Sequence, residues 1–132
     1  MSYKRVWLHI VWSTKFREPW LNENLRPKLF KHIRRNASEK GIYVDYLNGY
    51  VDHVHCLISL EPKQSFDKIV MLLKGESSHW INEYQLISGY FEWQTDFYVV
   101  SISDSDVNKV RDYIRNQDNH HKNNPSIDEL DD

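Results

Sequence analysis

The first predicted element is a strand over residues 4–15. The even-numbered positions from Val6 to Trp12 are apolar and share one face, and the intervening positions from Trp7 to Val11 are mostly apolar as well. Because both faces are apolar, we expect a central strand of a sheet, or one that also meets a partner subunit.

Helical spacing of apolar residues predicts two helices. The first begins at a capping Asn22 or Asn24, runs to about Lys40 and ends at Gly41. The second begins at Ser65 and runs to about residue 84. The residues that we expect to point inward are Leu25, Leu29, Ile33 and Ala37 in the first helix and Phe66, Ile69, Val70, Leu73 and Trp80 in the second.

Further elements complete the pattern. They are two strands at residues 42–50 and 52–60, a fourth strand at 93–103, and a helix that begins at Asp104 or Ser105 and ends near residues 119–124. Asn48-Gly49 is a common hairpin signal, so we expect the second and third strands to be joined there.

The order βαββαβα is that of the ferredoxin-like or RRM-like plan. This α+β fold has a four-stranded antiparallel sheet with two helices on one face, and here it would carry an additional C-terminal helix. Since the two helices can cover only one face, the second apolar face of the first strand predicts contact with a partner, and a two-fold homodimer is the simplest closed arrangement. The plan hosts many unrelated functions, so it selects none of them.

Length and composition indicate one small soluble domain. The chain of 132 residues fits a single domain, which we place at residues 1–124, and the acidic residues 125–132 are interpreted as a disordered tail. The single cysteine, Cys56, excludes a disulfide framework and a zinc site built from cysteines. No apolar run approaches the roughly 18 to 20 residues of a membrane span, so we expect a cytoplasmic protein.

Charge is distributed unevenly along the chain. The net charge is −2, yet residues 1–48 hold ten Lys and Arg against four acidic residues, a local balance of +6. This basic part could neutralise the phosphates of a nucleic acid. It could also be the solvated face of the first helix, which carries Lys28, Lys31, Arg34 and Arg35. Both interpretations stay open at the level of sequence.

His53 and His55 are the most informative pair of residues. They lie two apart in a predicted strand, so their side chains project from one face and Val54 projects from the other, into the core. Two imidazoles presented together at a cleft can bind a metal ion, although paired histidines in a strand are also common as hydrogen-bonded structural residues. His9, in the first strand, is expected to pack within the sheet.

A second pair lies in the predicted C-terminal helix. Tyr113 and Gln117 are four residues apart and therefore share one helical face. Taken alone, the first would be a partly buried helical tyrosine and the second a surface amide. The adjacent His120 and His121 point about 100° apart on a helix, so both cannot serve one ion.

Together the two pairs resemble a known arrangement. A His-x-His strand followed by a helical Tyr-x-x-x-Gln is similar to the single-tyrosine HUH transposases of small bacterial insertion sequences and to their relatives, the REP-associated tyrosine transposases. Other segments agree in order: residues 9–17 resemble the family's first strand and basic turn, 73–78 its second long helix and 93–101 its last strand. The resemblance spans about residues 4–123.

The resemblance implies a chemistry for four residues. His53, His55 and Gln117 would bind one divalent ion, and imidazole with an amide oxygen suits Mg²⁺ or Mn²⁺ with open positions better than a closed zinc site. Tyr113 would attack a DNA phosphate to form a 5′-phosphotyrosine, and a 3′-OH could later reverse this step without ATP.

The resemblance also implies partners. Members of the family act on single-stranded DNA whose ends are marked by hairpins, and they work as homodimers in which the histidines of one subunit meet the tyrosine helix of the other. Weaker candidates for DNA contact are Lys15, Arg17, Lys74 and Arg115, each of which ordinary surface charge also explains.

Two other interpretations remain open. One is a non-catalytic single-stranded nucleic-acid-binding module of RRM-like fold, although the aromatic signature of that module is absent. The other is a degenerate or domesticated transposase that binds hairpins without cutting them, although all four residues of the two pairs are present.

Overall fold

Strands and helices alternate along the chain in the order expected from the sequence. The computed structural model describes residues 6–117. The elements are β1 (Val6–Ser13), the short 3₁₀ helix η1 (Lys15–Arg17), α1 (Leu25–Glu39), β2 (Tyr43–Tyr50), β3 (His53–Leu60), α2 (Phe66–Glu83), β4 (Tyr98–Ile102), the short 3₁₀ helix η2 (Asp104–Asp106) and α3 (Val107–Arg115).

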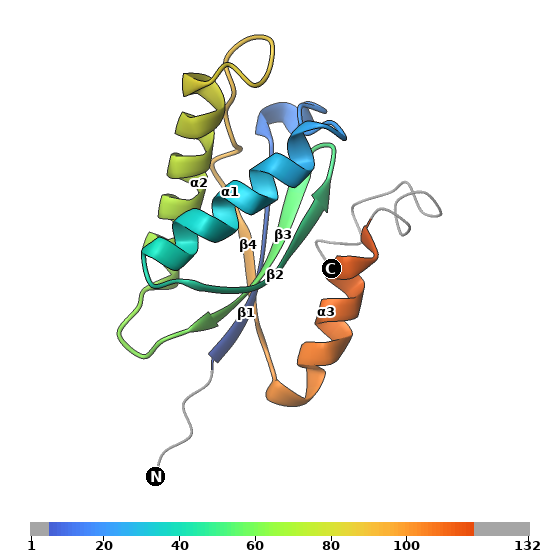
Figure 1. Cartoon of the computed structure of the whole chain (residues 1–132). Helices are drawn as coiled ribbons and strands as arrows, with labels where there is room; N and C mark the ends of the chain where they lie inside the picture. Colours follow the sequence, from blue (N-terminus) through green and yellow to red (C-terminus); the bar gives the residue numbers. More distant parts are fainter. Residues whose placement is uncertain (1–5, 118–132) are drawn as a thin grey trace.

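The strands form one antiparallel sheet in the order β2-β3-β1-β4. β1 is therefore a central strand, as its two apolar faces predict, and it pairs with β3 along its whole length from Val6↔Leu60 to Ser13↔His53. The predicted α+β fold with a four-stranded antiparallel sheet and a C-terminal helix is confirmed (Figure 1).

The helices α1 and α2 close one face of the sheet. Their apolar stripes pack on β1 and β3, and the buried set includes Leu29 of α1, Val70 of α2 and Trp12 of β1. The expected inward residues are buried or partly buried except Phe66, which opens α2 and is 41% exposed. Among the described residues, none of the helices is long and apolar enough to cross a membrane.

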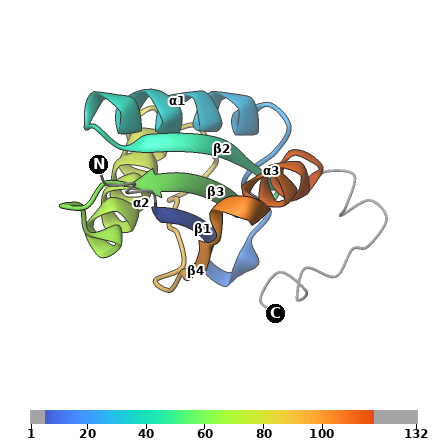
Figure 2. The same ribbon diagram turned by 90° about the horizontal axis from the view of Figure 1, so that it is seen from below.

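The helix α3 lies on the opposite face of the sheet from α1 and α2 (Figures 1 and 2). Val107 and Ile114 of α3 pack against Trp7 of β1 and Leu57 of β3. The two helices α1 and α2 cover one face as expected, but the expectation that the second apolar face of β1 is left for a partner was wrong, because it treated the C-terminal helix as an appendage. The apolar odd-numbered positions of β1 are covered within the chain, and they no longer require a second subunit.

The turn between β2 and β3 lies later than the sequence signal suggested. β2 continues through Asn48-Gly49 to Tyr50, and Val51-Asp52 make the turn. Gly49 is needed for a different reason: a Cβ there would run into the carbonyl oxygen of His53. The glycine lets β2 approach β3 closely at the first histidine.

Two other boundaries differ from the sequence prediction. β4 covers only Tyr98–Ile102, and Trp93, expected at its start, instead forms an isolated bridge with Thr14. α3 is described to Arg115, and the expected end near residues 119–124, like the acidic tail and His120-His121, lies outside the described residues.

Candidate active site

His53 and His55 lie side by side on the face of β3 that α3 covers. They are 1% and 0% exposed, and Val54 between them points into the core under α1 and α2. The alternation predicted from sequence is therefore present. The expectation of an open cleft was wrong, because α3 and its side chains cover both imidazoles in the single chain.

The imidazole of His53 is held by a carboxylate. Its Nδ1 lies 2.8 Å from Oδ1 of Asp52, and the other oxygen of Asp52 accepts from Nε of Arg17 at 3.3 Å. Burial acts to raise the pKa of Asp52, but the hydrogen bond and charge of His53 together with Arg17 outweigh it and lower the pKa. Asp52 is thus an anion that can only accept, so Nδ1 of His53 carries the proton and donates.

The imidazole of His55 is held by a second histidine. Nε2 of His9, on the neighbouring strand β1, lies 2.9 Å from Nδ1 of His55. His9 is 8% exposed, and burial lowers its pKa to about 4, so His9 is neutral near pH 7. The prediction that His9 packs within the sheet is confirmed, but its contact with a site histidine was not foreseen.

Tyr113 and Gln117, in the region of the C-terminal helix, contact the two histidines from the α3 side of the sheet. The ring of Tyr113 lies 5.7 Å from the ring of His55, measured between centroids, and Oε1 of Gln117 lies 3.4 Å from Nε2 of His53. Gln117 is fully buried, and its Nε2 donates to the backbone oxygen of Tyr113 at 3.3 Å. The structure therefore brings together the four residues that the two sequence motifs singled out, all from one chain.

Polar contacts dock α3 onto the sheet. Arg111 makes a two-pronged ion pair with Asp45 of β2, with both nitrogen–oxygen distances at 2.7 Å. Asn48 of β2 donates to the backbone oxygen of Ile114 at 2.9 Å, and Nε1 of Trp7 donates to Asp104 at 2.9 Å. These contacts position Tyr113 along the sheet.

The four weaker candidates for DNA contact are spread over the surface and bonded within the chain. Lys15 pairs with Glu92 at 2.8 Å, and Arg17 contacts Asp52 beside the histidines. Nζ of Lys74 donates to the backbone oxygens of Gln94 and Thr95 at 2.6 and 3.0 Å, and burial lowers its pKa.

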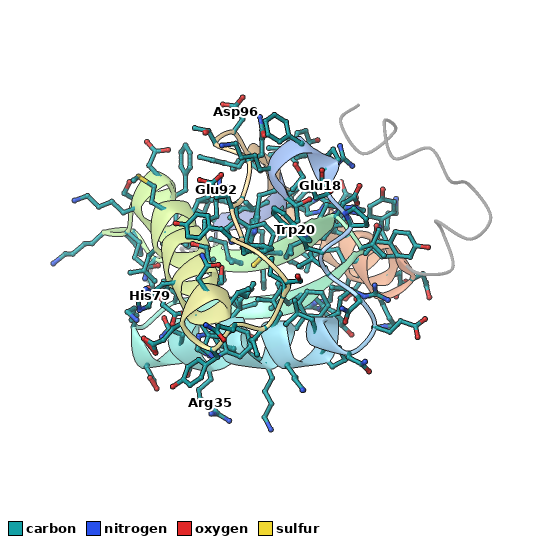
Figure 3. The ribbon with its side chains drawn as sticks, turned by 90° about the horizontal axis from the view of Figure 1, so that it is seen from above. Glu18, Trp20, Arg35, His79, Glu92 and Asp96 are labelled. Atoms are coloured by element: carbon teal, nitrogen blue, oxygen red, sulfur yellow. The ribbon has the colours of Figure 1, made fainter. Side chains whose placement is uncertain are left out.

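Lys74 and Lys15 therefore hold one loop, the segment before β4 that carries Glu92 and Asp96 (Figure 3). Arg115 of α3 donates to the hydroxyl of Tyr46 at 2.6 Å. Of the four, only Arg17 and Arg115 belong to segments that contact or flank the candidate site.

The basic residues of α1 lie away from this site. Lys28, Lys31, Arg34 and Arg35 are exposed on α1, which covers the other face of the sheet. Arg35 points away from the body of the protein (Figure 3). Exposure on α1 is compatible with both interpretations of this basic surface, and Arg34 also donates to the backbone oxygen of Val44 at 2.8 Å.

The described residues hold no group of three or more His, Cys, Asp and Glu side chains arranged as a metal site. A metal site here would therefore depend on an amide oxygen as its third protein ligand, and Gln117 provides one. Sequence reasoning missed Asp52 as a hydrogen-bond partner of His53. It also missed that Val51-Asp52 form the turn that places this carboxylate. The sequence signal for this role was that Asp52 directly precedes His53, since a carboxylate next to a ligand histidine often fixes the tautomer of that histidine.

The chain belongs to the IS200-like transposase family. The family model described as "Transposase IS200 like" matches residues 2–117, which include the whole of the described structure. The suspected kinship with single-tyrosine transposases is confirmed by this match and by the relatives that follow.

Curated relatives carry the same designation. The chain is 27% identical over 114 residues to the ISDra2 transposase TnpA of Deinococcus radiodurans, covering 83% of this chain and 81% of the relative. It is 26% identical over 115 residues to the transposase for insertion sequence element IS200 of Salmonella typhimurium, covering 83% of this chain and 74% of the relative.

Solved structures share the fold. A Deinococcus radiodurans protein assigned as a transposase matches with a TM-score of 0.71 at 24% identity, over 88% of this chain and 93% of that one. A REP-associated tyrosine transposase bound to a REP hairpin matches with a TM-score of 0.67 at 18% identity, over 94% of this chain and 72% of that one. The protein is thus a transposase by family, and its fold is that of tyrosine transposases.

Proposed function

We propose that the protein cuts and rejoins single-stranded DNA through a 5′-phosphotyrosine on Tyr113, with a divalent ion held by His53, His55 and Gln117. The observation that carries the proposal is the meeting of Tyr113 and Gln117 with both histidines at one buried place. These are the residue types of the His-x-His and Tyr-x-x-x-Gln motifs, and the chain's transposase family gives the reaction class.

The donor set fits Mg²⁺ or Mn²⁺. With Nδ1 of His53 donating to Asp52, Nε2 of His53 faces the carbonyl oxygen of Gln117 at 3.4 Å. A ring nitrogen and an amide oxygen that face each other in this way can share a cation or a proton. The distance is long for a hydrogen bond and suits two donors to one ion.

A bound ion would supply Lewis-acid polarisation of a phosphate oxygen. The chain's own residues do the rest. His53, His55 and Gln117 would hold the ion, and α3 excludes water from around the imidazoles. Asp52 and Arg17 hold His53 in place.

The Tyr113 oxygen would form a bond to phosphorus while the bond from phosphorus to the 3′ oxygen breaks. The products are a 5′-phosphotyrosine and a free 3′-OH, so one phosphodiester is exchanged for another. A 3′-OH of another strand then attacks the phosphotyrosine and restores the Tyr113 hydroxyl. Joining consumes no ATP because the ester bond is conserved.

The expected DNA is single-stranded and carries hairpins at the ends of the element. The structural relative bound to a REP hairpin supports this choice for the present chain. Lys15, Arg17, Lys74 and Arg115 remain proposed DNA contacts. Arg17 is the best placed of them, since it bonds the same carboxylate as His53.

The working unit is proposed to be a cytoplasmic homodimer in which α3 of one subunit serves the histidines of the other. The single chain already assembles the four residues, so docking within one subunit is the competing arrangement. A protein lacking both histidines is mixed with Tyr113→Phe protein under conditions of proven subunit exchange. Recovered cleavage supports sharing, and no recovery means that each subunit works alone.

The experiment that tests the reaction uses single-stranded DNA from the flanks of the element, with and without Mn²⁺. We expect a covalent protein–DNA adduct whose peptide maps to Tyr113. Tyr113→Phe removes one hydroxyl and should abolish the adduct while DNA binding survives, and Tyr98→Phe, which alters another tyrosine ring near His9, is the matched control. An adduct on a different tyrosine, or one that forms equally in Tyr113→Phe, contradicts the assignment.

The RRM-like binding module is less well supported. Such a module stacks bases on the sheet face opposite its two helices, and in this chain α3 covers that face through Val107 and Ile114. DNA binding without cleavage by the wild-type protein in Mn²⁺ would favour that alternative, or a domesticated relative.

A further inference from the structure

The two histidines of the candidate site are supported by different partners. Asp52 is a carboxylate and can only accept from His53, which leaves no choice of tautomer. The partner of His55 is His9, and a neutral imidazole can either donate or accept through Nε2. Which of the two nitrogens carries the shared proton therefore decides what His55 can do.

The geometry of the His9–His55 contact is that of an in-line hydrogen bond. The two nitrogens are 2.9 Å apart, whereas the ring centroids are 5.1 Å apart with 24° between the planes. Rings in face-to-face contact would have their centroids much closer, so these rings meet edge to edge, nitrogen to nitrogen. In such a contact one nitrogen must donate and the other must accept, so the tautomer of one ring fixes the tautomer of the other.

Backbone pairing fixes this contact. His9 is opposite Leu57 in the β1–β3 register, and His55 is opposite Val11, so the two histidines are diagonal neighbours on one face. Both side chains are buried, and the ring of Tyr113 packs edge-on to each of them, at 6.3 Å from His9 and 5.7 Å from His55. His9 therefore has little room to adopt another orientation.

We propose that His9 is a positioning residue that accepts a hydrogen bond from Nδ1 of His55 and so keeps a lone pair on Nε2 of His55 for the divalent ion. His9 plays for His55 the part that Asp52 plays for His53. The inference rests on the proposed metal site. The opposite tautomer pair, with His9 donating, would place a proton on Nε2 of His55 and block that nitrogen as a ligand.

The first test needs neither metal nor DNA. Imidazole nitrogen NMR of the metal-free wild-type protein reports which nitrogen of His55 is protonated, and His55→Gln identifies its signals. We expect Nδ1 protonated and Nε2 bare. A protonated Nε2 on neutral His55 overturns the inference whatever the protein does to DNA.

The second test measures Mn²⁺ affinity by electron paramagnetic resonance in the folded protein without DNA. His9→Leu removes the acceptor and should weaken binding by about 10- to 100-fold, the range typical for loss of a residue that orients a metal ligand. His9→Gln retains an acceptor oxygen and should recover most of the affinity. His79→Leu removes an exposed histidine that bonds only Glu83 on the same helix, and it is the matched control.

Unchanged Mn²⁺ affinity in folded His9→Leu protein overturns the inference. If His9→Leu fails to fold, the wild-type tautomer still decides. Absence of Mn²⁺ binding by the wild-type protein counts against the proposed metal chemistry, and the tautomer measurement then judges His9 separately.

Discussion

The two faces of the sheet differ in what fills them. Under α1 and α2 the filling is mostly apolar, with Leu29 and Val70 both 0% exposed within a large cluster. Under α3 a small apolar cluster lies beside buried polar groups, among them His53, His55 and Gln117. One strand, β3, serves both faces because its side chains alternate.

The difference teaches how a small domain separates stability from chemistry. Apolar burial stabilises the fold, whereas buried polar groups cost free energy unless each is hydrogen-bonded. The α3 face therefore depends on specific contacts such as Arg111–Asp45 and His53–Asp52. We expect α3 to open at lower free energy than the rest of the fold, because local stability follows local apolar contact.

The largest expected effect comes from emptying the α3 face of its imidazoles. His53→Leu combined with His55→Leu should reduce cleavage to background, since the proposed ligands are lost and leucine supplies none. Leucine is preferred to alanine because both positions are buried, and alanine would leave cavities. The measurement is adduct formation in Mn²⁺. Hydrogen exchange of α1 and α2 is the control, and it should show that the packing of these helices on the sheet is intact. Persistent metal-dependent cleavage would refute the ligand assignment.

A change on the sheet face under α1 and α2 is expected to lower stability and leave cleavage unchanged. Leu29→Ala removes a fully buried side chain far from the histidines and should lower the free energy of unfolding by about 2–5 kcal/mol. Denaturant titration measures this loss, and cleavage by the remaining folded protein should be unchanged. If cleavage fell while the protein stayed folded, the two faces would be coupled more tightly than we argue.

A smaller effect is expected from removing the ion pair that holds α3 against β2. Arg111→Ala leaves the nearly buried carboxylate of Asp45 without the two hydrogen bonds that Arg111 donates and should cost about 1–3 kcal/mol. The loss should appear mainly as faster hydrogen exchange in α3, with β1 and β3 protected as before. Lys109→Ala removes a longer and more exposed ion pair of the same helix and serves as the control. Uniform acceleration across the sheet would show that α3 is part of one cooperative unit with it.

The smallest effect concerns Cys56, whose side chain is buried on the sheet face under α1 and α2. Burial raises the pKa of its thiol to about 12, above the 9.0 of an exposed thiol. The folded protein holds this proton more tightly than the unfolded chain. Its stabilising contribution is therefore complete below pH 9 and is lost as the pH rises from 9 toward 12.

By about pH 10 the loss should reach roughly 1.4 kcal/mol. The free energy of unfolding of Cys56→Ala protein, measured across the same pH range, should lack this component. Native protein at neutral pH should also resist thiol alkylation, and Arg111→Ala should not change that, because opening α3 exposes the other face. Rapid alkylation of Arg111→Ala protein would contradict the separation of faces.

Much of the candidate site followed from local periodicity. A spacing of two in a strand and of four in a helix placed His53 with His55, and Tyr113 with Gln117, before any tertiary information was used. Turn position did not follow so well: Asn48-Gly49 carries a hairpin signal, yet Gly49 lies within β2. The close approach of β2 to the His53 carbonyl, a tertiary demand, accounts for the glycine.

The sequence by itself determined the order of strands and helices, the alternation of β3 and the pairing of residues within each motif, because these depend on the geometry of a single strand or helix. Only the tertiary structure decided that α3 covers the second face, that its contacts with β2 bring Tyr113 and Gln117 over the histidines, and that His9 meets His55. The His9–His55, His53–Gln117 and Arg111–Asp45 contacts join residues 46, 64 and 66 positions apart. They arise from strand register and helix docking, which local periodicity does not encode.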